Sequence, residues 1–299
     1  MDIDPLADTV PPRHALESDE EEDEYNPLRP SNSQSSNQVA DVKILGQLPP
    51  GRNLVIATGD VAKYWARGAE LGEQSGAVYV NNIQVGLMFN PSWTKNTIII
   101  SEALTRLPPW AMHPYASTIL DSLKPSKVSL LDTYAAPSYI TEDPVPLHDA
   151  PLRYLATASV VPAVKSAAEP YAPPNLIQST SASLLSLIAF FALPSAPVTA
   201  SEGEPGPPTS TATAGTLILV PSPHIPHAPP KVLEPNNFTR LAEDRFEWPE
   251  STVNAAQELV FAAFDNEERP PRWVYRKERG GEGEGGRRRR DVGDGGMYI

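Results

Sequence analysis

The stretch "NLVIATG" at residues 53–59 decides the fold class of this chain. It is a short run of apolar and β-branched residues that closes on a glycine, which is the pattern of a strand buried on both faces. The next stretch, "DVAKYWARGAE" at residues 60–70, has helical periodicity and offers Asp60 as an N-cap. A buried strand that passes through a glycine turn into a helix predicts an α/β fold.

Further apolar runs continue this alternation along the chain. Strands are expected at residues 77–89, 96–102, 127–134, 153–159 and 216–222, and the first two of these runs are expected to pair. Helices are expected at residues 113–126, stopped by Pro125, within residues 174–194, and at residues 251–264. The second of these helices is apolar on all sides, which predicts a central helix covered on more than one face.

The two flanks of the chain differ from this centre in composition. The 299 residues include 34 prolines and 18 glycines, and the net charge of the whole chain is −13. Residues 1–45 alone carry eleven acidic and three basic side chains. We therefore expect a disordered acidic tail at residues 1–43, a single α/β domain at 44–268 and a flexible tail at 269–299. Within the domain we expect a flexible insertion at 195–215 and a proline-rich loop at 221–237.

Composition also excludes several classes of protein. The absence of cysteine excludes disulfides, Cys-ligated zinc and a cysteine nucleophile. A mildly acidic body gives no reason to expect nucleic-acid binding. The most apolar stretch, residues 184–193, is shorter than the roughly 20 residues that cross a bilayer, and no signal peptide opens the chain. We expect an intracellular protein, cytoplasmic and also nuclear if the chain carries an import signal.

No motif in the chain identifies a catalytic, cofactor or metal site. The turn from Thr58 to Asp60 ends a strand, where α/β enzymes hold active sites, but it is not a glycine-rich phosphate loop. His224 and His227 are three residues apart, but no third metal ligand stands nearby. His148 and Asp149 resemble a base with its orienting acid, without a nucleophile motif. We predict no cofactor and no metal.

The last seven residues, "GDGGMYI", end a glycine-rich segment with two apolar residues around a tyrosine. Residues 280–296 have the composition of a coil with a reach of roughly 20–25 Å. Such a tether delivers Met297, Tyr298 and Ile299 to a neighbouring protein. Met297 suits an irregular apolar pocket, Tyr298 offers a rigid ring with one hydroxyl, and Ile299 carries the α-carboxylate.

A basic run precedes this terminus. Its four residues are Arg287, Arg288, Arg289 and Arg290. The run is compatible with a nuclear-import signal, with an electrostatic contact to an acidic partner, and with a solvated charged segment.

The terminal hydrophobic–Tyr–X sequence resembles the motif with which proteasome activators and assembly factors dock between α-subunits of the proteasome core. The segments "NLVIATGDVAKYW", "KVSLLDTY", "PNLIQSTSASLLSLIAFFALP" and "TLILVPS" are similar, in order and spacing, to the first member of the proteasome assembly chaperone family. The resemblance covers most of residues 43–222. The insertion, the proline-rich loop and the Gly/Arg tether depart from the family pattern.

The resemblance implies a non-catalytic α/β/α sandwich related to nucleoside phosphorylase-like domains. It further implies a heterodimer with a second assembly chaperone, seated on the outer face of the forming proteasome α-ring. Carried over by position, Met297 is the hydrophobic residue of the motif, Tyr298 its tyrosine, and Ile299 supplies the carboxylate that meets a pocket lysine. The alternative from a different class is an enzyme of nucleoside phosphorylase or hydrolase type using the Thr58 to Asp60 turn. A mature proteasome activator is a third reading, which the size of the domain disfavours.

Overall fold

The computed structural model describes residues 39–46, 49–142, 145–192, 213–235, 246–264 and 269–275. All the helices and strands described below lie within one compact unit, Ala40–Ile299. Most of the predicted acidic tail, nearly all of the predicted insertion and most of the predicted C-terminal tail lie outside the described residues, and β1 begins at Val42, within the range expected for the acidic tail.

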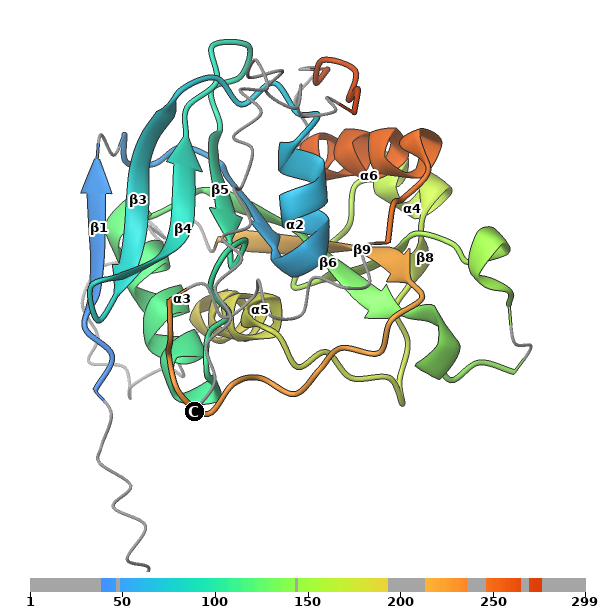
Figure 1. The fold of residues 1–299 in the computed structure, drawn as a ribbon. Coiled ribbons are helices and arrows are strands. Elements are labelled where there is room, and N and C mark those ends of the chain that lie inside the picture. Colours follow the sequence, from blue (N-terminus) through green and yellow to red (C-terminus); the bar gives the residue numbers. More distant parts are fainter. Residues whose placement is uncertain are drawn as a thin grey trace, which may run out of the picture. The chain divides into compact units, whose positions relative to one another are not determined.

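A mixed nine-stranded sheet forms the centre of this unit, in the order β1-β3-β4-β5-β2-β6-β9-β7-β8 (Figure 1). Its strands are β1 (Val42–Gly46), β2 (Leu54–Thr58), β3 (Gln74–Val80), β4 (Ile83–Phe89), β5 (Thr97–Ser101), β6 (Lys127–Ala135), β7 (Arg153–Ala156), β8 (Glu169–Pro170) and β9 (Ala214–Ser222). The four strands β5, β2, β6 and β9 are parallel, whereas β1, β3, β4 and β7 join by antiparallel pairing. Every residue of β2 and β5 is buried, as their continuous apolar runs predict.

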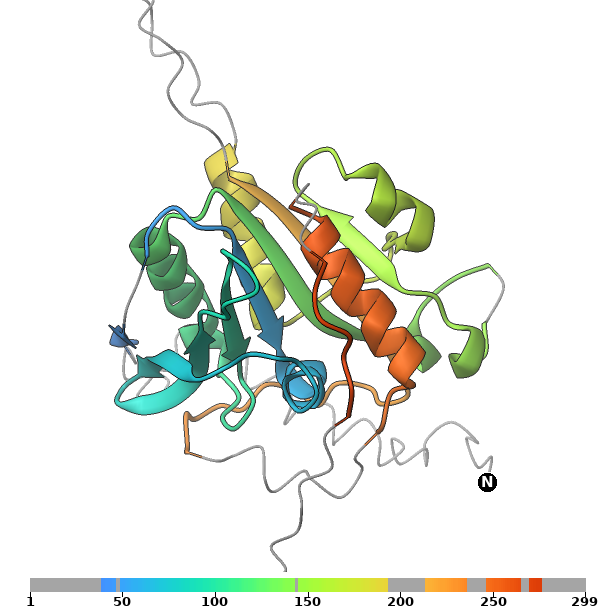
Figure 2. The same cartoon turned by 90° about the horizontal axis from the view of Figure 1, so that it is seen from above.

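Helices cover both faces of the sheet (Figure 2). One face carries α2 (Gly59–Ala66), α4 (Pro162–Ala167) and α6 (Glu250–Ala262), and the other carries α3 (Pro109–Leu123) and α5 (Thr180–Ala192). Two short 3-10 helices, η2 (Ala136–Ser138) and η3 (Leu147–Asp149), follow β6. A separate apolar core fills the space on each side of the sheet. The predicted three-layer α/β/α fold is therefore confirmed.

Two expectations about these elements were wrong. The run at residues 77–89 is not one strand but the hairpin β3–β4, because Asn81 and Asn82 take left-handed φ values of 48° and 65° and reverse the chain. The second half of the run does pair with β5, as expected. Helix α5 is buried on one face only, since Phe190 and Phe191 remain 68% and 56% exposed.

Packed residues also continue beyond Glu268, where the expected domain boundary lay. Trp273 is buried, and its indole N–H donates to the backbone oxygen of Trp65 at 2.7 Å. Residues 269–275 thus pack against the end of α2. In the part of the chain that the structure describes, no helix combines the length and apolarity needed to span a membrane.

Candidate functional site

Polar side chains converge where three parallel strands end. Since β5, β2 and β6 are neighbours and parallel, their register puts Glu102 just after β5 and Thr58 at the end of β2 level with Asp132, which lies inside β6. Helix α5 begins at the same edge, and the Ser181 hydroxyl donates to Thr58 Oγ1 at 3.2 Å. The Thr58 to Asp60 turn predicted from the sequence is therefore part of a larger polar group, which we call the strand-end cluster.

Glu102 is the most unusual residue of the strand-end cluster. It is buried, and its backbone has a left-handed φ of 55°, which is uncommon for a residue other than glycine. Its Oε1 accepts the Leu107 N–H at 2.6 Å. Burial raises the pKa of Glu102 to about 7, and the nearby Asp132 carboxyl acts in the same direction.

Asp132 is the second buried carboxyl of the cluster. Its Oδ2 accepts a hydrogen bond from the Ser179 hydroxyl at 2.7 Å, and its Oδ1 accepts the Thr133 N–H at 2.7 Å. Burial raises the pKa of Asp132, although the hydroxyls of Ser179 and Ser181 oppose that shift. Both buried carboxyls therefore favour the protonated form more than a carboxyl in water does.

Asp60 stands beside these groups but is accessible to solvent. It lies in the first turn of α2 and is not the N-cap, because Thr58 occupies that position and Gly59 makes the turn with φ +70°. Partial desolvation raises the pKa of Asp60, and the positive charges of Lys63 and Arg106 counteract this shift.

The proline-rich residues 223–235 form a strap along the same edge of the molecule, without helix or strand. Arg106 Nη2 donates to the backbone oxygen of His227 at 2.7 Å, and Trp110 Nε1 donates to that of Lys231 at 3.2 Å. In the view of Figure 1 the strap passes from the end of β9 below α5 toward α3. The strap brings His224 and His227 near enough to Asp60 to lower the pKa of Asp60.

The other candidate groups do not assemble a reactive site. On η3, His148 Nε2 lies 3.2 Å from Asp149 Oδ2, but both side chains are largely exposed. Within the described ranges, no three His, Asp or Glu side chains are arranged to hold a metal ion. The buried carboxyls of the strand-end cluster accept hydrogen bonds from their own chain, which fixes the neighbouring loops.

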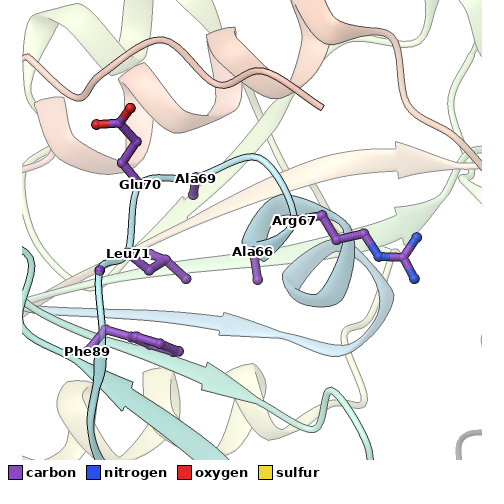
Figure 3. Close-up of a pocket in the computed structure, with 7 residues that line it drawn as sticks. Ala66, Arg67, Ala69, Glu70, Leu71 and Phe89 are labelled. Atoms are coloured by element: carbon purple, nitrogen blue, oxygen red, sulfur yellow. The ribbon is translucent and has the colours of Figure 1, made fainter. Parts of the chain in front are cut away.

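A surface hollow of about 470 Å³ lies at the opposite end of α2 from the strand-end cluster. Its lining includes Ala66, Arg67, Ala69, Glu70, Leu71 and Phe89 (Figure 3). The side chains of Arg67 and Glu70 point away from each other, and the remaining labelled residues are apolar. The hollow therefore has an apolar lining with separated charges and no acid–base pair.

The predicted docking residues Met297, Tyr298 and Ile299 lie outside the described residues. So do Arg287, Arg288, Arg289 and Arg290.

Sequence reasoning missed Glu102, Asp132, Thr180 and Ser181. A signal for them exists, because Glu102 directly follows the apolar run "IIIS" and Asp132 directly follows "SLL", and the two hydroxyls begin a helix. Polar residues at the ends of neighbouring buried strands are placed together by parallel pairing.

Comparison with known proteins finds a distant structural similarity. No family model matches the chain, and no curated protein matches it. Among solved structures the chain is similar to PbaA of Pyrococcus furiosus, an archaeal homolog of proteasome-assembly chaperone, with 13% identity and a TM-score of 0.39. That alignment covers 61% of this chain and 77% of PbaA.

Two proteins of unknown function are similar to a comparable degree. The protein from Thermoplasma acidophilum is 8% identical with a TM-score of 0.38, over 73% of this chain and 87% of that one. The protein from Corynebacterium glutamicum is 10% identical with a TM-score of 0.37, over 77% of this chain and 80% of that one. At these values the similarities assign no function to this chain.

Proposed function

We propose that the protein is a non-catalytic chaperone for assembly of the proteasome core particle. In this proposal it acts as a heterodimer with a second assembly chaperone on the outer face of the α-ring. The C-terminal Met297, Tyr298 and Ile299 dock in a pocket between α-subunits. The observation that carries the proposal is the apolar–Tyr–apolar sequence at residues 297–299 behind a Gly/Arg-rich segment, in a chain whose other segments resemble this chaperone family in order and spacing.

The physics of a terminal tripeptide suits such a role. A buried tyrosine ring and a captured carboxylate give a few kcal/mol, as single anchors in interfaces do. Attachment to a domain that makes its own contact with the ring raises the effective concentration of the tripeptide. The last described residue is Tyr275, and its ring centroid lies 5.7 Å from that of Tyr64 on α2. Affinity divided between separable contacts also permits release, which a chaperone requires.

The hydrogen bonding of the strand-end cluster supports the non-catalytic part of the proposal. Glu102 and Asp132 are buried and accept local N–H and O–H groups, an arrangement that positions loops. A catalytic carboxyl has to meet the substrate, directly or through one water.

Removal of the last three residues tests the proposal directly. The chain lacking Met297–Ile299 and the Tyr298→Ala variant should capture purified proteasome α-subunits at least about 30-fold more weakly than the parent, since a hot-spot residue contributes about 2 kcal/mol or more. One residue added after Ile299 should weaken capture comparably, because it displaces the carboxylate. Val292→Ala changes an apolar residue of the same segment outside the tripeptide and should bind like the parent. Unchanged capture by the shortened chain would overturn the docking role.

An enzyme at the Thr58 to Asp60 turn is the second candidate function. The observation that favours it is the convergence of Asp60, Glu102 and Asp132, with raised pKa values, at the carboxyl ends of parallel strands. This candidate requires nucleoside phosphorolysis or hydrolysis that survives loss of Met297–Ile299 and disappears in Asp60→Asn. A panel of nucleosides, assayed with and without inorganic phosphate, separates the two candidates.

A further inference from the structure

The buried carboxyls of the strand-end cluster connect segments that are far apart in the chain. Glu102 Oε1 holds the Leu107 N–H, which closes the segment between β5 and α3. Asp132 holds the hydroxyl of Ser179, directly before the first turn of α5. Thr180, the first residue of α5, is completely buried beside Glu102. Two carboxyls thus fasten one loop and the start of one helix to the strand ends.

The charged and titratable groups around the pair come from every neighbouring element. Asp132 of β6 acts on Glu102, and Arg106 of the loop opposes that effect. Tyr115 of α3 also faces Glu102, and its hydroxyl shares a hydrogen bond of 2.9 Å with Ser101. On the other side Asp132 faces Asp60 of α2.

A larger group of basic side chains lies around Asp60 than around the buried pair. Lys63 of α2, Arg106, and His224 and His227 of the strap all face Asp60 and compensate its charge. Among the groups named, Arg106 is the one cation that acts on Glu102 as well. Full ionisation of Glu102 and Asp132 would place two negative charges in a buried site with little compensation.

We propose that Glu102 and Asp132 form a protonation-dependent latch on the strand ends. While the pair retains a proton, residues 102–107 and the first turn of α5 stay closed. When both carboxyls are ionised, their repulsion and their need for water favour an opened state of these two segments.

The expected size of the effect follows from linkage. An opened, hydrated Glu102 has its ordinary pKa of 4.5, whereas the closed state holds the pKa at about 7. The proton belongs to the pair, so opening releases it between these two pH values. The equilibrium constant for opening should rise roughly tenfold per pH unit in this interval, about 300-fold in total, and level off above it.

Amide hydrogen exchange of the full chain, measured by NMR from pH 5 to pH 8, tests the latch. Each rate is divided by that of an unstructured peptide at the same pH, which removes the intrinsic base catalysis. The reporters are the amides of Leu107, which bonds Glu102, and Ala182, which bonds the Ser179 oxygen at 3.0 Å in the first turn of α5. Their protection should fall steeply up to about pH 7 and then stay constant. Protection of Lys124, whose amide bonds Leu120 at the end of α3, should not change with pH.

Matched variants assign the effect to the pair. Glu102→Gln keeps the shape and the acceptor without the charge, and it should weaken the pH dependence of Ala182 protection, because only Asp132 of the pair still titrates. Glu73→Gln removes the same charge from an exposed position and should preserve the parental pH dependence. Asp132→Asn removes the like charge, so the fall in protection should move to lower pH.

Direct titration keeps the proposal falsifiable if a variant fails to fold. The side-chain carboxyl carbon of Glu102 in the parent should titrate with a midpoint well above the ordinary 4.5. A midpoint near 4.5, or equal pH dependence of Ala182 protection in Glu102→Gln and the parent, would overturn the latch.

Discussion

Trp273 shows how a single residue joins distant parts of the chain. Its ring is buried, its indole N–H donates to Trp65, and Asn254 of α6 bonds both its backbone N–H and its backbone oxygen. Gly68 permits this approach, because a Cβ at that position would lie 2.5 Å from the Trp273 ring. The tryptophan therefore fastens residues 269–275 between α2 and α6.

Replacement of this tryptophan should be costly. Trp273→Phe removes the indole donor, so the Trp65 oxygen keeps only the N–H groups of Gly68 and Ala69, and it also removes part of the packed ring. We expect a loss of roughly 2–4 kcal/mol in the free energy of unfolding, measured by urea denaturation. Val274→Ala alters the neighbouring residue, which is 51% exposed, and should change stability by less than about 0.5 kcal/mol. Similar losses in the two variants would contradict the packing described for this segment.

The sequence does not reveal this contact, and the reason is physical. Trp273 stands among prolines and charged residues, a composition that indicates an exposed tail. Its partner Trp65 lies 208 residues away, and no periodicity connects the two. The same limit applies to Glu102, since only the pairing of β2 with both β5 and β6 shows which polar residues it meets.

At the scale of elements, α5 shows that an apolar helix need not be buried on every face. Leu184, Leu187 and Ile188 face the core, whereas Phe190 and Phe191 contact each other near the end of the helix and remain exposed. The all-round apolar pattern predicted cover on more than one side, but the described chain supplies cover on one.

A pair of substitutions on α5 measures this asymmetry. Leu184→Ala empties a fully buried site and should lower the free energy of unfolding by about 2–5 kcal/mol. Phe190→Ser truncates a side chain that is 68% exposed and should change it by less than about 0.5 kcal/mol. Thermal or urea unfolding of both variants gives the comparison. A loss for Phe190→Ser as large as that for Leu184→Ala would mean that this end of α5 is covered.

Some strands can be predicted from their own residues, whereas others can be recognised only from the strands they pair with. The central strands β2, β5, β6 and β9 are buried on both faces, so a continuous apolar run is sufficient to predict them. The edge strand β1 has no fully buried residue, and its sequence carries no comparable signal. The hairpin turn was predictable in principle, because Asn-Asn between two apolar runs favours left-handed backbone.

At the scale of the whole molecule, buried acids set the pH dependence of folding. The pKa of Glu102 is about 7 in the folded state and 4.5 when exposed, and the pKa of Asp132 shifts in the same direction. A raised pKa means that the stabilising contribution is complete below 4.5 and is lost as the pH rises through 7. For Glu102 the loss amounts to roughly 3 kcal/mol at most.

The protein should therefore be more stable at pH 5 than at pH 8. Urea denaturation at pH 5, 6, 7 and 8 measures this trend, and Glu102→Gln should flatten it while raising the stability at pH 8. Stability that increases with pH over this range would show that these carboxyls are hydrated in the folded protein.

Strand β9 enters the sheet between β6 and β7, although both precede it in the chain. Until residues 214–222 have been synthesised, a nascent chain holding β6 and β7 exposes one unpaired edge of each, and α6, which packs against β6 and β9, is synthesised later still. Such non-local pairing is slow to form, and open edges attract other chains. During translation the sheet can close only late, so this protein should itself need protection from aggregation before its last third has left the ribosome.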